Sequence, residues 1–437
     1  MKHFVYSLIT LLQVGFLCNA AQVGFNKVGY ITSEPFPNSF VYISSVIDAQ
    51  GRIIAVGLTS VINDDSHGLI VRYKEDGSLD TTFNGTGFIN TENGTDSSIY
   101  YSVALDVQGR IVVAGQTDNT LNNGNKNGLI ARYNENGSLD TTFNNGAGFI
   151  TNVPNNSNTY NSVAVDNQGR ILVVGRTDDN NAFIARFNQN GTALDNNFGT
   201  NGVVTNVPNN SFIYYSVALD VQGRIVVAGQ TDSVNDDSHG LIVRYKEDGS
   251  LDTTFNNGTG FINTENGTNS SIYYSVALDV QGRIVTVGQT DFELDLDEES
   301  YGLIVRHNEN GSLDTTFNGT GFIISKAINS FHYISLVIDT QGRIVVAGQT
   351  NNNGALIARF KSDGTLDTYF NQISAQSYNK VLIDNNKIIV VGYNDQNHGL
   401  IARYLSNGVL DTESNWNSSN FRESAQINNI SIGMLSR

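Results

Sequence analysis

Cysteine is almost absent from this chain of 437 residues, which contains only Cys18. That cysteine falls in the N-terminal stretch MKHFVYSLITLLQVGFLCNAAQ, where Lys2 precedes an apolar run (residues 4–17) and a small residue, Ala20. The pattern predicts a signal peptide over residues 1–20 and a secreted, periplasmic or cell-surface protein. Cleavage near Ala20 would leave a mature chain with neither disulfides nor thiol chemistry.

Positive charge is also scarce. The chain has 25 Lys and Arg against 42 Asp and Glu, a net charge of −17. Nucleic-acid binding and docking on anionic lipid both need a basic face, so we expect neither. No second apolar run is long enough to span a bilayer, so we expect no membrane insertion after signal cleavage.

Motifs that carry enzyme chemistry are missing as well. The sequence has no GxSxG elbow, no HExxH pair and no phosphate-binding glycine loop. His67, His239 and His398 occupy equivalent positions in separate copies of a repeat, which argues against a shared metal site. These absences favour a protein that is not an enzyme and uses no cofactor.

What the chain does have is a repeat. The segment SVALDVQGRIVVAGQT (102–117) recurs with small changes, and the arginine of its QGR triplet falls at intervals of 58, 60, 54 and 59 residues, then 60. A seventh, degenerate copy has Lys387 at this position, 44 residues further on. Periods of this size are typical of propellers and solenoids. The arginines are Arg52, Arg110, Arg170, Arg224, Arg283 and Arg343.

Each copy divides into four short strands. SVALD and RIVVAG are β-rich runs joined by a tight turn, GLIVRY is a third, and LDTTFNGTGFI ends in a fourth. No helical periodicity of apolar residues appears in the mature chain. The sequence therefore predicts an all-β fold, a seven-bladed β-propeller of four-stranded antiparallel blades.

The two ends of the repeat array bear on closure and blade count. GFNKVGYI (24–31) is similar to a fourth strand and would complete the last blade, hiding an open sheet edge. The tail (416–437) is the less regular part, and residues 421–432 faintly resemble the start of another unit, so eight blades is the alternative. We expect a propeller over 21–415 and a C-terminal tail or partial blade over 416–437.

The motifs GSLDTTFN, the GFI strand, SVALDVQGRIVVAGQT and GLIARY together resemble the delta-60 repeat family of exported bacterial proteins. The resemblance covers roughly residues 24–412 and implies a β-propeller and export. It supplies no catalytic residues, because the family has no settled molecular function. Unit seven departs most, with Lys387 in place of arginine.

Several features survive in all seven units, including an Asp that ends the first strand, two glycines, and an Arg in the third strand. An Asp in the following LD pair also recurs. We predict that the third-strand Arg and the LD Asp form structural ion pairs, because a charge beside an apolar run needs a partner. An anion-binding ring of seven arginines is the alternative, but the matched Asp residues would neutralise it. The predicted pairs are Arg72–Asp80, Arg132–Asp140, Arg186–Asp195, Arg244–Asp252, Arg306–Asp314, Arg359–Asp367 and Arg403–Asp411.

Loops between strands two and three, and between successive units, vary in length. Antiparallel alternation puts both sets at one end of the blades, opposite the tight turns, and recognition usually sits on such loops. This acidic, Asn-rich face is the predicted binding face. Its candidate residues are Asp64, Asp65, Asp118, Asp178, Asp179, Asp291, Asp295 and Asp297.

The densest acidic cluster (residues 291–299) could hold calcium, but it lacks the spacing of an EF-hand loop, so a solvated loop is the favoured interpretation. The sequence therefore favours a surface module that binds a protein or a glycan. The alternatives are a glycan-active hydrolase or lyase with acidic residues near the propeller axis, and a purely structural surface protein.

Overall fold

The computed structural model describes the chain over 28–32, 39–60, 66–91, 97–118, 126–151, 158–177, 179, 181–205, 211–231, 238–264, 270–291, 300–326, 331–350, 354–370, 375, 377–412 and 433–434. The predicted signal peptide (1–20) lies outside these residues, and so does the predicted C-terminal tail or partial blade (416–437) apart from residues 433–434. No helix within the described ranges is both long and apolar enough to cross a membrane.

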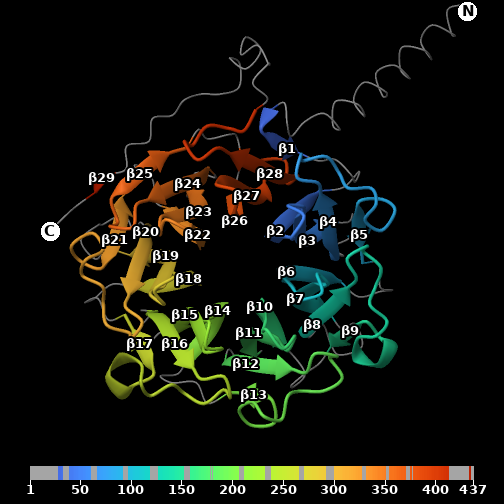
Figure 1. The fold of residues 1–437 in the computed structure, drawn as a ribbon, viewed down its shortest axis with the longest axis horizontal. Coiled ribbons are helices and arrows are strands. Elements are labelled where there is room, and N and C mark those ends of the chain that lie inside the picture. Colours follow the sequence, from blue (N-terminus) through green and yellow to red (C-terminus); the bar gives the residue numbers. More distant parts are fainter. Residues whose placement is uncertain are drawn as a thin grey trace, which may run out of the picture.

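Seven antiparallel sheets surround a common axis, so the predicted seven-bladed β-propeller is confirmed (Figure 1). In blades 1 to 6 the strands run outward in chain order, and in blade 7 the outermost strand is the N-terminal β1. Figure 1 places β2, β6, β10, β14, β18, β22 and β26 nearest the centre. The elements outside the blades with assigned bounds are two 3-10 turns, η2 (Asn144–Gly146) and η3 (Asn256–Gly258).

The first three blades have the following strands. Blade 1 contains β2 (Phe40–Ile47), β3 (Ile53–Ser60), β4 (Ser66–Tyr73) and β5 (Phe88–Asn90). Blade 2 contains β6 (Ser98–Leu105), β7 (Ile111–Asp118), β8 (Lys126–Tyr133) and β9 (Phe149–Thr151). Blade 3 contains β10 (Asn158–Val165), β11 (Ile171–Thr177), β12 (Ala182–Phe187) and β13 (Val203–Val204).

The remaining blades repeat this plan. Blade 4 contains β14 (Ser211–Leu219), β15 (Ile225–Thr231), β16 (Gly240–Tyr245) and β17 (Phe261–Asn263). Blade 5 contains β18 (Ser271–Leu278), β19 (Ile284–Asp291), β20 (Ser300–His307) and β21 (Phe322–Lys326). Blade 6 contains β22 (Phe331–Ile338), β23 (Ile344–Thr350), β24 (Ala355–Phe360) and β25 (Leu366–Tyr369). Blade 7 contains β26 (Ser377–Asp384), β27 (Lys387–Tyr393), β28 (Gly399–Tyr404) and the N-terminal β1 (Tyr30–Thr32).

The ring closes through β1, which pairs antiparallel with β28 and opposes Ile31 to Ile401. The predicted closure by an N-terminal strand is therefore present, and it covers an edge that blade 7 would otherwise leave open. At the other end of the chain, β29 (Gly433–Met434) adds to the outer strand of blade 5 by pairing with β21.

The hydrophobic core is divided into seven clusters, one at each junction between neighbouring blades. One cluster joins Ile54 and Val56 of blade 1 to Tyr100 and Val113 of blade 2. The last one joins Val391 of blade 7 to blade 1. Each middle strand is buried on both faces by this arrangement, which explains why its sequence is apolar without alternation.

Two recurrent glycines have different physical roles. Gly77 closes the hairpin after the third strand with a φ of +81°, which favours glycine. Gly57 in the second strand has no such backbone, but a Cβ there would lie 1.9 Å from the Val41 carbonyl oxygen. The two recurrent glycines therefore serve a left-handed turn and a close approach of two strands.

Candidate functional site

The blades have two different ends. Tight turns such as residues 48–52 and 74–78 close one end, which we call the turn end. The strands leading into the loops of unequal length meet at the opposite end, the loop end, and most of those loops fall outside the described residues.

At the turn end, each third-strand arginine forms an ion pair with the LD aspartate of its own blade. The nitrogen–oxygen distances run from 2.6 to 2.8 Å in all seven blades. In blade 1 the second oxygen of Asp80 accepts hydrogen bonds from the backbone and hydroxyl of Thr82. Burial alone would raise the pKa of Asp80, but these hydrogen bonds and the Arg72 charge outweigh burial and lower that pKa.

The arginines also link neighbouring blades. Arg72 Nη1 donates to the backbone carbonyl of Glu135 in blade 2, and Arg403 closes the circle by donating to Glu75 in blade 1. The guanidinium of Arg72 also lies 4.6 Å from the centre of the Phe83 ring. Sequence reasoning missed this link, because a carbonyl acceptor leaves no side-chain signature in the next unit. Equivalent bonds join Arg132 to Gln189, Arg186 to Glu247, Arg244 to Glu309, Arg306 to Ser362, and Arg359 to Ser406.

The aspartate that ends the first strand pairs with the QGR arginine. Asp106 and Arg110 are 2.6 Å apart, and Arg110 also lies 3.3 Å from the LD aspartate Asp140. Blade 7 keeps part of this contact, because Lys387 lies 2.9 Å from Asp411. The turn end thus carries two circles of cations matched by two circles of carboxylates.

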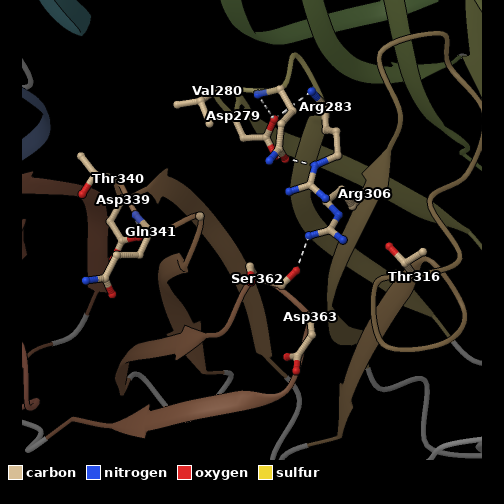
Figure 2. Close-up of a pocket in the computed structure, with 12 residues that line it drawn as sticks. Asp279, Val280, Arg283, Arg306, Thr316, Asp339, Thr340, Gln341, Ser362 and Asp363 are labelled. Atoms are coloured by element: carbon tan, nitrogen blue, oxygen red, sulfur yellow. Dashed lines mark hydrogen bonds and ion pairs between the residues drawn. The ribbon is translucent and has the colours of Figure 1, made fainter.

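A groove of about 450 Å³ opens at this end between blades 5 and 6 (Figure 2). Figure 2 shows that its charged walls are already engaged: Arg283 bonds to Asp279, and Arg306 reaches the Ser362 carbonyl. A smaller groove of about 100 Å³ lies between blades 3 and 4. Because these cations are neutralised within the protein, neither groove offers a free anion-binding group.

The predicted acidic binding residues are only partly described. Asp118 ends β7, Asp179 lies between β11 and β12, and Asp291 ends β19, so these three stand on different blades. Within the described part of the chain, no group of three or more His, Cys, Asp and Glu residues could hold a metal ion. The other candidates, Asp64, Asp65, Asp178, Asp295 and Asp297, lie outside the described residues.

The three equivalent histidines stand on blades 1, 4 and 7. His67 and His239 are half-buried, and the Nδ1 atom of each has no hydrogen-bond partner among the described residues. His398 stacks on Phe40, with 6.1 Å between ring centres. The stacking of His398 on Phe40 therefore lies at the junction of blades 7 and 1.

A different set of side chains gathers where the inner strands surround the axis. Tyr215 and Tyr274 contact each other edge to face at 5.4 Å between ring centres, and Tyr274 lies 5.8 Å from His332. Arg176 acts electrostatically on Tyr215 and on Tyr101. We call Tyr101, Tyr215, Tyr274 and His332 the axial aromatic cluster.

A β-bulge positions these tyrosines. In blade 5 the pairing of β18 with β19 slips between Tyr273 and Ser275, so Tyr274 is an extra residue with no partner in β19. Tyr101 and Tyr215 occupy the same bulge in blades 2 and 4. The three tyrosines remain half-buried, and all three lie on the innermost strands of their blades (Figure 1).

Polar groups complete the cluster. The hydroxyls of Tyr215 and Tyr274 donate to the amide oxygens of Gln230 and Gln289, at 3.1 and 3.2 Å. Burial raises the pKa of both tyrosines, so both remain protonated. Burial lowers the pKa of His332, which keeps it neutral. The cluster therefore combines ring faces with amide and hydroxyl groups and carries no charge of its own.

Sequence comparison of the seven units overlooked a further constant feature. A tyrosine stands six residues before the Asp that ends each first strand, and all seven side chains are buried. Each precedes the bulge residue and so anchors it. Its recurrence at the same position in all seven units was the signal in the sequence that could have found it. These tyrosines are Tyr42, Tyr100, Tyr160, Tyr214, Tyr273, Tyr333 and Tyr378.

Together the closed ring and the repeated blade define a β-propeller built from tandem units. Six segments match the family model described as a domain of unknown function (DUF5122) beta-propeller. The match supports a β-propeller repeat family for this chain. The matched segments are 50–83, 109–143, 223–255, 282–317, 342–370 and 384–413.

No curated protein matches the sequence significantly. Among solved structures, the mitotic checkpoint complex aligns with a TM-score of 0.50 and 11% identity, over 87% of this chain and 90% of that one. A polysaccharide lyase, an ulvan lyase, aligns with a TM-score of 0.47 and 13% identity, over 88% and 96% of the two chains. The WD40 beta propeller domain of Doa1 gives 0.45 and 13%, over 84% and 94%. At these identities the similarity concerns the fold alone.

Proposed function

We propose that this protein is an exported, non-enzymatic β-propeller of the delta-60 kind that binds a glycan through the axial aromatic cluster. The observation that carries the proposal is the continuous contact of Tyr215, Tyr274 and His332 across three blades, on the strands that lie nearest the axis. Export rests on the predicted signal peptide.

The chemistry of the cluster suits a sugar. Half-buried aromatic rings provide flat apolar area at a low entropic cost, and each tyrosine adds a polar hydroxyl. Gln230 and Gln289 supply amide groups beside those rings. A sugar ring has an apolar C–H face and a rim of hydroxyls, so it matches aromatic ring faces that have a few polar groups beside them.

The alternative of a glycan-active hydrolase receives less support. A hydrolase needs two carboxyl groups at the reacting bond. Six of the seven aspartates that end the inner strands are in ion pairs with arginine, namely Asp48, Asp106, Asp166, Asp220, Asp279 and Asp339. The seventh, Asp384, ends β26 in blade 7, so one carboxylate and not a pair is left without an ion-pair partner among these described positions. A lyase that uses a phenolate base is also disfavoured, because burial raises the pKa of Tyr274.

Glycan binding can be tested with residues that the fold already accepts. Ile43 and Ile334 occupy the bulge position of Tyr215 and Tyr274 in blades 1 and 6, so Tyr215→Ile and Tyr274→Ile should fold. A glycan array on the mature protein identifies an oligosaccharide, and calorimetry then gives its affinity. Each variant should weaken binding about two- to tenfold, since an aromatic contact contributes about 0.5 to 1.5 kcal/mol.

Phe149→Ala provides a matched control, because this exposed aromatic lies on the outer strand β9. Its affinity should equal that of the unchanged protein. Unaltered binding in both tyrosine variants would contradict the proposed site. A protein captured in place of any glycan, or consumption of the oligosaccharide, would point to the protein-binding or enzyme alternative.

A further inference from the structure

One position on the inner strands breaks the symmetry of the ring. The residue four before the strand-ending aspartate is serine in six blades, and it is Lys380 in blade 7. Pairing with the second strand places Lys380 opposite Val391, as Ser335 is opposite Ala347. Lys380 therefore occupies the structural position of a serine. The serines are Ser44, Ser102, Ser162, Ser216, Ser275 and Ser335.

Three of the six serines at this position, Ser102, Ser216 and Ser335, accept a hydrogen bond from the next blade. Ser102 Oγ accepts a hydrogen bond from the backbone N–H of Val163 in blade 3 at 3.2 Å. Ser216 accepts from Val276 and Ser335 accepts from Val381 in the same manner. Each of these three serines thus satisfies an N–H on the inner edge of the next blade, where no further strand can do so.

The junction from blade 7 to blade 1 lacks this arrangement. An ammonium group is a donor only, so Lys380 cannot accept the N–H of the equivalent residue, Ser45. Ser45 is itself exceptional, because the other six blades have valine or leucine at this position. Its hydroxyl oxygen is buried and has no hydrogen-bond partner among the described residues. By equivalence with the other blades, Lys380 and Ser45 both belong to the junction of blades 7 and 1, and the Ser45 hydroxyl makes no hydrogen bond among the described residues.

Lys380 has no neutralising partner in the described part of the chain. Its ammonium group has neither an ion pair nor a hydrogen bond there, and burial lowers its pKa. Its side chain keeps part of its surface accessible. By contrast, Lys387 seven residues later is paired with Asp411. An unpaired cation inside a protein is costly, so its retention needs a reason.

We propose that the junction between blades 7 and 1 is an anion site, in which Lys380 and Ser45 bind a carboxylate or sulfate group. Lys380 supplies the charge, and Ser45 supplies its hydroxyl and backbone N–H. For the identity of the ligand the proposal rests on the proposed function: the group belongs to an acidic glycan whose neighbouring sugars lie on the axial aromatic cluster. His332, on the inner strand of blade 6, is the cluster member whose blade adjoins blade 7.

The test uses substitutions that restore the residues of the other blades. Lys380→Ser removes the cation, and Ser45→Val keeps the cation but removes the hydroxyl. Lys361→Ser is the charge-matched control, because Lys361 lies in an exposed turn after β24. Two measurements are made on each mature protein. One is the melting temperature in sodium sulfate against sodium chloride at equal ionic strength. The other is the affinity for an acidic and for a neutral oligosaccharide.

Sulfate should raise the melting temperature of the unchanged protein and of Lys361→Ser more than that of Lys380→Ser. General salt effects are equal in all three and cancel. Lys380→Ser should bind the acidic oligosaccharide about ten- to a hundredfold more weakly while its affinity for the neutral one is kept. Ser45→Val should show a smaller loss. Without salt, Lys380→Ser should melt at a higher temperature than the unchanged protein.

Equal sulfate shifts and equal acidic-glycan affinity in Lys380→Ser and Lys361→Ser would overturn the anion site. The anion site would also be overturned if Lys380→Ser bound acidic and neutral oligosaccharides with equally reduced affinity. The effect of Lys380 would then not depend on the charge of the ligand. If no oligosaccharide binds but the sulfate difference is present, the anion site stands and the glycan-binding function fails.

Discussion

At the scale of single residues, paired tyrosines mark most blades. The hydroxyls of Tyr42 and Tyr73 are hydrogen-bonded at 2.8 Å, and the same pair recurs in blades 2, 4 and 7. Blade 5 has His307 where its partner tyrosine would stand, and both His307 Nδ1 and the Tyr273 hydroxyl lack a partner among the described residues. His307 therefore occupies a position that holds a hydrogen-bonded tyrosine in blades 1, 2, 4 and 7.

This substitution predicts a specific sensitivity to acid. Burial lowers the pKa of His307 to about 4, from 6.5 in an exposed chain. Between these values the unfolded chain takes up a proton that the folded protein refuses, so stability is full above the unfolded pKa and is lost as the pH falls. The free energy of unfolding should drop by about 2 kcal/mol between pH 7 and pH 5 from this group.

His307→Tyr should remove that drop and add a hydrogen bond of about 1 kcal/mol at pH 7. Urea denaturation at the two pH values measures both effects. Tyr245→Phe is the control, since it removes one hydroxyl without changing any titration in this range and should keep the pH dependence. Identical pH dependence of His307→Tyr and the unchanged protein would show that His307 does not titrate in this way.

At the scale of elements, the third-strand arginine holds a hairpin to its own strand and a strand to the next blade. Arg72 is 2% exposed, and its loss would leave Asp80 buried beside Thr82 without its cation. We expect Arg72→Met to lower the free energy of unfolding by about 3 to 5 kcal/mol. Chemical denaturation followed by circular dichroism measures this change.

Two further variants make that experiment specific. Arg176→Met removes an exposed arginine with no ion pair among the described residues and should change stability by less than about 0.5 kcal/mol. The double variant Arg72→Met with Asp80→Leu removes both charges and should be more stable than Arg72→Met alone. If the double variant has a lower free energy of unfolding than Arg72→Met, the unpaired charge of Asp80 is not the cause of the destabilisation.

At the scale of the whole molecule, stability depends on closing the ring. Ile31 of β1 is buried in the cluster that joins blades 7 and 1, whereas Thr32 beside it is exposed. Ile31→Asp places a charge in that junction and should lower the free energy of unfolding by about 3 kcal/mol or more. Thr32→Asp, in the same strand, should leave it within about 0.5 kcal/mol.

Thermal unfolding of the two variants measures the contrast. If both substitutions changed the free energy of unfolding by the same small amount, β1 would contribute little to ring closure, and the ring would be stable without it. The ring also brings together residues that differ between blades. Tyr274, His332 and Lys380 all lie on inner strands around one axis.

Much of the architecture was predictable from the sequence because each local pattern recurs in all seven units. The strands, the tight turns, the close-approach glycines and the charged pairs are each set by residues within one unit. The binding site was not predictable in the same way. The loop aspartates stay a prediction, since Asp118, Asp179 and Asp291 stand on separate blades and the others lie outside the described residues.

By itself the sequence determined the blade: its four strands, its seven copies and the pairing of Arg72 with Asp80, because these depend on contacts a few residues apart. Only the tertiary structure decided which residues of different blades contact one another. The bond from Arg72 to the Glu135 carbonyl and the contact of Tyr215 with Tyr274 join different blades. Such contacts depend on how the ring closes, which is fixed by packing between distant segments and not by any local pattern.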